Sequence, residues 1–203
     1  MSATVAPAAT DRSDFRTVLI AGTRVGVVIA VMVVLYLAVA RYLTGGAADV
    51  AEALLVLAGG VVAAFLPGRW AVARTIEGIA GGAAIGLWGS IVFSVIDIAV
   101  LRPTRAYPWT WDDVGGGSTW WYLPMWWMLA TFLAWHGGVL VAAGAPRGRS
   151  SLASVAGPVV VGAVVLAVLA RLAGLHGVLP VQAGLGFAVT LVALSIVALT
   201  RKA

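Results

Sequence analysis

The chain has no cysteine among its 203 residues, which removes several kinds of chemistry at once. Disulfides, thiolate metal sites, iron–sulfur clusters and cysteine nucleophiles all require that residue. Histidine is almost as scarce, because only His136 and His176 are present, and they fall in different segments. They do not form a bis-histidine haem site, and the one lysine, Lys202, leaves no lysine within a helix for a Schiff base. We therefore expect no metal, no cofactor and no catalytic centre.

Charge is also sparse. Charged residues make up 10% of the chain, whereas a soluble domain carries about 25%. Hydrophobic residues make up 62%, and the mean hydropathy is +1.03. A water-soluble fold cannot cover so much apolar surface, so the composition indicates a protein whose main partner is the lipid bilayer. The net charge of +5 comes from single basic residues scattered between apolar segments, a pattern that argues against a nucleic-acid partner.

Six apolar segments account for most of the sequence, and about 20 apolar residues are enough to cross a bilayer as a helix. The breaker pair Pro67-Gly68 ends the second segment. Residues 1–16 are small and polar, and we expect them to form a disordered cytoplasmic tail. The sequence thus predicts an all-α integral membrane protein with a single six-helix domain over residues 17–203. The six expected helices cover residues 18–43, 50–66, 78–101, 120–143, 155–172 and 181–200.

The basic residues beside these segments predict the orientation, because cytoplasmic loops carry an excess of Lys and Arg. With the N-terminus inside, nine basic residues fall on the inner side and four on the outer side. The inner group is Arg12, Arg16, Arg24, Arg69, Arg74, Arg147, Arg149, Arg201 and Lys202. The outer group is Arg41, Arg102, Arg105 and Arg171. We therefore expect both termini to be cytoplasmic, in a bacterial-type inner (plasma) membrane.

Tryptophan is concentrated in one part of the chain, with seven of the nine between Trp109 and Trp135. Indole rings favour the headgroup level of a bilayer, so an aromatic belt explains those nearest the outer loop. The remaining three would lie one to three turns inside the membrane, where each indole N–H needs an acceptor. Two interpretations stay open for them, a lipid-facing belt and the lining of a cavity or helix interface. These candidates are Trp126, Trp127 and Trp135.

Small residues recur every four positions along the third segment. Such a ladder lets another helix approach closely, so we expect these residues to pack against a neighbouring helix. The ladder consists of Gly78, Gly82, Gly86, Ser90 and Ser94, and Asp97 continues the same face.

Ionisable residues within membrane spans are costly and mark candidate sites. Asp97 and Arg171 are each expected near the outer end of a helix, at similar depth. We predict that Asp97 is held by a basic partner, first choice Arg171, rather than acting as a free proton carrier. His136 lies deeper and is flanked by Gly137 and Gly138, which would admit a close neighbour. It is either a hydrogen-bonded packing residue or a proton relay.

Two functions of different classes fit this sequence. The first is a small transporter or a transporter membrane subunit, with three plus three helices forming inverted halves and with Asp97, His136, Arg171 and the three deep tryptophans around a substrate cavity. The second is a non-catalytic subunit or scaffold. It would dock another membrane protein, or a second copy of the chain, through its small-residue helix face and its aromatic outer surface. An inverted repeat with an internal cavity would favour the first, and a solid bundle would favour the second.

Overall fold

The computed structural model describes residues 10–107, 121–148, 151–175 and 177–201. Within this part of the chain, six helices are long and apolar enough to cross a membrane, which confirms the prediction of a multi-pass helical bundle. They are α1 (Phe15–Tyr42), α2 (Gly45–Trp70), α3 (Ile76–Ile96), α5 (Tyr122–Gly144), α6 (Leu152–Leu172) and α7 (Leu179–Thr200). A π-helical turn, η1 (Asp97–Leu101), extends α3, and a short 3₁₀ turn, η2 (Ala145–Arg147), follows α5.

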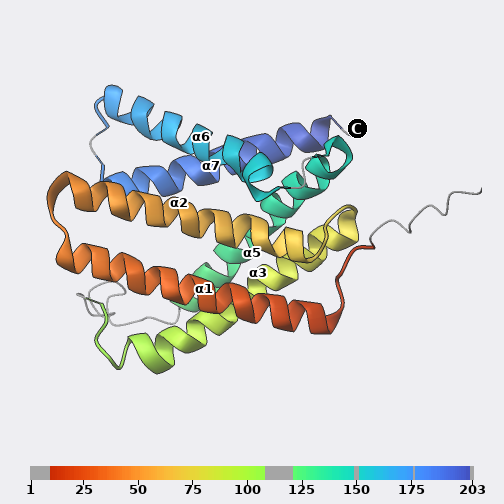
Figure 1. Cartoon of the computed structure of the whole chain (residues 1–203), viewed down its shortest axis with the longest axis horizontal. Coiled ribbons are helices and arrows are strands. Elements are labelled where there is room, and N and C mark those ends of the chain that lie inside the picture. Colours follow the sequence, from red (N-terminus) through yellow and green to blue (C-terminus); the bar gives the residue numbers. More distant parts are fainter. Residues whose placement is uncertain (1–9, 108–120, 149–150, 176, 202–203) are drawn as a thin grey trace, which may run out of the picture.

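The helices run side by side as a bundle with two distinct ends (Figure 1). We call the end where α1 begins and α7 finishes the terminal end, and the opposite end, where α1 meets α2, the distal end. The distal end also holds η1 and the start of α5. Which end faces the cytoplasm stays a prediction from the basic residues.

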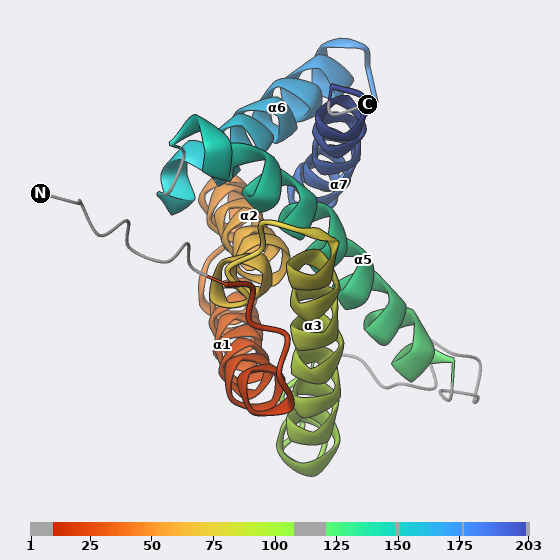
Figure 2. The ribbon, with the colours of Figure 1, turned by 90° about the vertical axis from the view of Figure 1, so that its right-hand side faces the viewer.

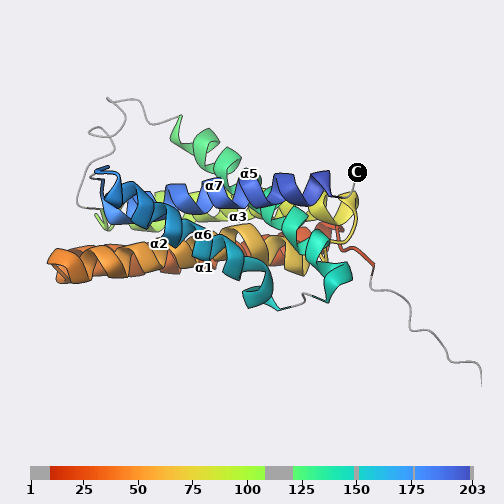
Figure 3. The same cartoon turned by 90° about the horizontal axis from the view of Figure 1, so that it is seen from above.

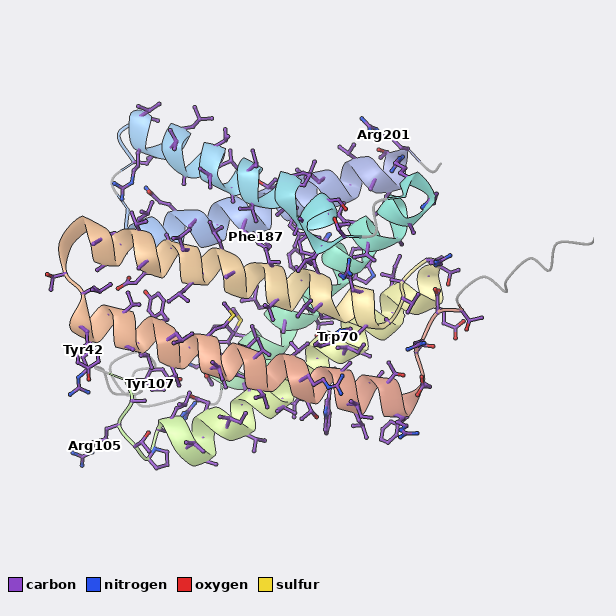
Figure 4. All side chains as sticks on the ribbon, viewed as in Figure 1. Tyr42, Trp70, Arg105, Tyr107, Phe187 and Arg201 are labelled. Atoms are coloured by element: carbon purple, nitrogen blue, oxygen red, sulfur yellow. The ribbon has the colours of Figure 1, made fainter. Side chains whose placement is uncertain are left out.

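Helix α2 lies in the middle of the bundle, between α1 on one side and α7 on the other (Figure 1). The largest buried cluster joins α2 to α6 and α7, and includes Leu57, Phe65, Val159, Phe187 and Leu191. Phe187 points from α7 toward α2 (Figure 4), where a Cβ on Gly60 would lie only 3.0 Å from its ring. The ring therefore occupies the space that the missing side chain leaves.

The expected break at Pro67-Gly68 is wrong, because α2 continues to Trp70. A proline lacks one backbone donor, but its carbonyl can still accept, and here Ala71 N–H donates to Pro67 O at 2.9 Å. Both residues of the pair are buried. A Cβ on Gly68 would lie 2.8 Å from the Cα of Gly138, so tight packing against α5 holds the last turn of α2 in place.

The expected disordered tail is ordered from Asp11 onward, and α1 begins at Phe15 rather than at residue 18. The Asp11 carboxylate accepts hydrogen bonds from the backbone N–H groups of Arg74, Thr75 and Gly78 and from the Thr75 hydroxyl. Gly78 lies in the first turn of α3, Thr75 is its N-cap residue and Arg74 precedes the cap, so none of these N–H groups has a partner within the helix. An acidic side chain from another part of the chain thus caps α3, where the helix dipole favours negative charge.

The ladder of small residues on α3 meets different neighbours along its length. Gly78 makes room for the tail, since a Cβ there would lie 2.6 Å from the Asp11 carboxyl carbon. At Gly82 a Cβ would lie 3.1 Å from Gly68 on α2, and at Gly86 it would lie 2.5 Å from Ala134 on α5. This face of α3 is therefore occupied inside the molecule.

The two halves of the bundle pack differently. Helix α1 lies along α2 and α3, whereas α6 packs mainly on α7 and barely meets α5 (Figure 1). In an inverted repeat α5 and α6 would correspond to α1 and α2 and would make matching contacts. The packing therefore gives the predicted 3+3 arrangement no support.

Candidate functional site

The most polar place inside the bundle is the carboxylate of Asp97, at the first position of the π-helical turn η1. Its side chain is completely buried. The turn is defined by a backbone hydrogen bond of 2.9 Å from Arg102 N–H to Asp97 O, which joins residues five apart instead of four. Such π turns are rare and are frequently found at functional sites.

Three side chains donate hydrogen bonds to the Asp97 carboxylate. Arg102 Nε donates to Oδ2 at 2.8 Å and forms an ion pair with it. The Tyr122 hydroxyl donates to the same oxygen at 3.1 Å, and the Tyr107 hydroxyl donates to Oδ1. The Arg102 guanidinium also lies over the Tyr122 ring, 4.9 Å from its centre. A buried carboxylate with this many partners is held as a fixed ion pair.

The cluster of Asp97, Arg102, Tyr107 and Tyr122, which we call the Asp97 cluster, joins three parts of the chain. Asp97 ends α3, Arg102 and Tyr107 lie in the segment that follows, and Tyr122 begins α5. Tyr107 lies at the distal end beside η1 (Figure 4). Burial, and then the hydrogen bond to Asp97, raise the pKa of Tyr107, so its hydroxyl keeps its proton and remains a donor. The cluster therefore ties both flanks of the α3–α5 connection to one buried charge.

The predicted ion pair between Asp97 and Arg171 is wrong. Asp97 is bonded to Arg102, while Arg171 Nε donates to the Gln182 side chain at 3.1 Å. The physical reason is local, because the π turn brings Arg102 over Asp97, whereas Arg171 lies on α6, and α6 packs on α7. A search for i+3 and i+4 partners on an α-helix does not find a residue at i+5.

The three deep tryptophans do not share one environment. Trp127 is half-buried, and its indole N–H donates to Ser94 Oγ on α3 at 3.3 Å. Trp126 is 40% exposed and makes edge contacts with Phe93 and Tyr122, with ring centres 6.0 Å apart in both cases. Trp135 is 41% exposed. Trp127 thus belongs to the α3–α5 interface, and the other two lie on the outer surface of α5.

His136 is buried at the crossing of α5 and α7. Its Nδ1 lies 2.6 Å from Ser195 Oγ, and that hydroxyl donates to Val192 O at 2.8 Å. Because the hydroxyl proton is used there, the network assigns the donated hydrogen to Nδ1. Within the described residues Nε2 has no hydrogen-bond partner, and the ring edges meet Phe132 and Trp135. This geometry favours the packing interpretation over a proton relay.

Gly137, the residue after His136, packs against backbone. A Cβ on Gly137 would lie 1.9 Å from the carbonyl oxygen of Ala64 on α2. Glycine at this position lets α2 and α5 touch directly, and α7 then closes over the histidine through Ser195.

Two cavities lie at opposite ends of the bundle. One, at the terminal end, is lined by α5, η2, α6 and α7, and the other, at the distal end, is lined by Asp49, Arg171 and residues 177–179. Neither is lined by Asp97, by His136 or by the deep tryptophans. Among the residues that the structure describes, no group of three or more His, Asp or Glu side chains is placed to hold a metal ion.

Comparison with known proteins finds no matching family, no matching curated protein and no matching solved structure. Sequence reasoning found Asp97 but missed Arg102, Tyr107 and Ser195. Their closeness in sequence could have indicated two of these partners, since Arg102 and Tyr107 follow Asp97 within ten residues.

Proposed function

We propose that this chain is a non-catalytic membrane subunit that docks a transmembrane helix of another membrane protein along the exposed face of α5 between Trp121 and Trp135. The single observation that carries the proposal is Trp135. It lies about 20 Å from the start of α5, at ~1.5 Å per residue. Its indole N–H has no acceptor among the described residues, and its side chain is exposed on the helix surface. An unpaired donor in hydrocarbon is costly, and a neighbouring helix can supply the acceptor.

Trp135 is one of a row of large side chains on the same face. The spacing between them is four, three, four and three residues, which is the heptad pattern that packs one helix against another. Aromatic and thioether side chains give large, adaptable contact surfaces. The row, which we call the α5 stripe, consists of Trp121, Met125, Met128, Phe132 and Trp135, all exposed.

The distal half of α5, which carries the stripe from Trp121 to Phe132, diverges from the other helices (Figures 2 and 3). Trp135 is exposed just beyond it. Other lipid-facing surfaces have a different composition. The exposed large side chains of α6 are valines and leucines, for example Val161, Val164 and Val168. Branched aliphatic side chains suit lipid tails, whereas a row of Trp, Met and Phe suits a specific helix contact.

Three further observations support docking over transport. The small-residue face of α3 is filled by the tail, α2 and α5, so of the two expected docking surfaces the aromatic one on α5 is open. The cavities lined by Arg147 and by Arg171 lie at the ends of the bundle, and the packing of the two halves does not match. The Asp97 cluster has the geometry of a fixed ion pair that holds the distal start of α5 in position.

Site-specific photocrosslinking in native membranes tests the proposal. A benzophenone amino acid at Met128 should give a protein adduct of defined mass, and the same group at Val164 on α6 should give lipid adducts alone. An adduct of twice the chain mass would identify the partner as a second copy. Trp135→Phe keeps an aromatic ring, though a smaller one, and removes the N–H donor, so it should weaken capture about threefold to tenfold. Equal products from both positions would refute the docking surface.

A further inference from the structure

The cavity at the terminal end is built from the last turns of α5, the short η2 turn, the beginning of α6 and the end of α7. It has a volume of about 140 Å³. Figure 2 shows the three helices from this end. Its walls are largely apolar and include Leu140, Val155, Pro158 and Leu194, while its mouth carries Arg147 and Arg201.

The two arginines have many unused donors. Arg147 donates one hydrogen bond, from Nη1 to Ala143 O at 3.0 Å, which caps a carbonyl at the end of α5. Arg201 lies at the end of α7 (Figure 4), where its backbone N–H donates to Val197 O at 3.3 Å. Its side chain makes no hydrogen bond or ion pair with the described residues. A guanidinium has five N–H donors and keeps its charge at any physiological pH.

No acidic side chain lines this cavity. The described acidic residues of the terminal end are Asp11, Asp14 and Glu77, and all three are engaged at α1 and α3. Asp11 caps α3, Asp14 accepts from Thr17, and Glu77 accepts from Ser13. The cavity therefore holds two cations without a counter-charge from the described chain, and it favours an anionic ligand.

We propose that this cavity binds the phosphate group of an anionic phospholipid. Arg147 and Arg201 lie at the ends of membrane spans, which is the depth of lipid headgroups. The apolar walls continue outward to exposed Pro158 and Val197, where acyl chains can follow the surface of α6 and α7. Free inorganic phosphate shares the anionic chemistry but gains nothing from these walls. The inference does not depend on the docking surface of α5.

Native mass spectrometry of the full chain in detergent tests the inference. Phosphatidylglycerol should bind more tightly than phosphatidylcholine with the same acyl chains. Combining Arg147→Gln with Arg201→Gln should weaken phosphatidylglycerol binding about 30-fold, on the usual contribution of two basic residues near an anionic lipid surface. The matched control combines Arg16→Gln with Arg24→Gln, two exposed arginines of α1 outside the cavity. It changes the net charge equally and should leave binding unchanged.

Two further variants separate the cavity from a loss of folding. The lysine pair, Arg147→Lys with Arg201→Lys, should retain most of the binding. Ala198→Leu fills the cavity without a change of charge and should weaken binding. Equal binding of the two lipids, an equal loss in the control, or full binding by Ala198→Leu would overturn the site. Displacement of the lipid by an equal concentration of inorganic phosphate would overturn its assignment to a lipid.

Discussion

The strongest test of the fold is the ion pair between Asp97 and Arg102. Arg102→Gln would leave a completely buried carboxylate without its cation. Removing one member of a buried pair typically costs ~3 to 5 kcal/mol, and the full burial of Asp97 places this variant toward the upper end of that range. Asp97→Asn instead removes the ion-pair partner of Arg102. The Arg102 side chain is 23% exposed and can reach water, so we expect a smaller loss of about 3 kcal/mol.

The double variant separates pairing from two independent effects. With both charges removed, neither is left buried without its partner. One tyrosine hydroxyl can still donate to the amide oxygen, and the other can accept from the amide N–H. We expect the combined change to cost about 2 kcal/mol, well below the sum of about 7 kcal/mol for the single changes. Tyr122→Phe removes one hydrogen bond of the cluster and should cost about 1 kcal/mol.

Reversible unfolding in mixed detergent and dodecyl sulfate micelles, followed by helical circular dichroism, gives these free energies of unfolding. Arg171→Gln is the matched control, because its guanidinium is exposed and bonded to Gln182, and it should cost less than about 1 kcal/mol. If the losses for Asp97→Asn and Arg102→Gln simply add, the two residues are not coupled. Such additivity would refute the pairing of Asp97 with Arg102 through the π turn.

Three other predictions follow from the same structure. Asp11→Asn should lower stability at neutral pH. Burial of Asp11 opposes ionisation, but hydrogen bonds from Thr75 and the first turn of α3 outweigh it and lower the pKa of Asp11 below 3.8. Its contribution is thus present above that value and lost as the pH falls below it, and acid titration of the melting temperature should show this loss in the wild type but not in the variant. Gly137→Ala should cost about 3 kcal/mol or more because its Cβ would meet the backbone of α2, whereas Gly157→Ala, with open space around it, should be neutral by the same unfolding assay. In this cysteine-free chain, Thr44→Cys should react with an impermeant thiol reagent from outside the cell and Thr10→Cys should not, and the reverse pattern would overturn the predicted orientation.

Local sequence patterns predicted the six helices. Contacts between distant segments determined where α2 ends and that the chain is ordered from Asp11 onward. The lengths of the apolar segments predicted six spans, because any helix that crosses a bilayer needs about 20 apolar residues. The predicted helix break at Pro67 was wrong, because packing of Gly68 against Gly138 outweighs the low helix propensity of one proline. The tail was expected to be disordered because its residues are small and polar. Composition alone does not show that Asp11 will accept a hydrogen bond from a free N–H group of α3.

The candidate site shows the same division. Asp97 stood out because a carboxylate in an apolar segment is costly wherever the chain places it. Its partner did not stand out, because an α-helical spacing puts Arg102 on another face, and the π turn alone brings the two together. The tryptophans likewise looked alike in sequence, yet Trp127 faces α3 while Trp126 and Trp135 face outward.

By itself, the sequence determined that this chain is a multi-pass helical membrane protein, since hydropathy is a sum over local residues and the bilayer acts on each span separately. Only the tertiary structure decided which polar groups meet. Hydrogen bonds and ion pairs depend on distances of a few ångströms and on the direction of each side chain, and these are set by how the helices pack. The Asp97 cluster, the cap that Asp11 places on α3 and the open α5 stripe all follow from that packing.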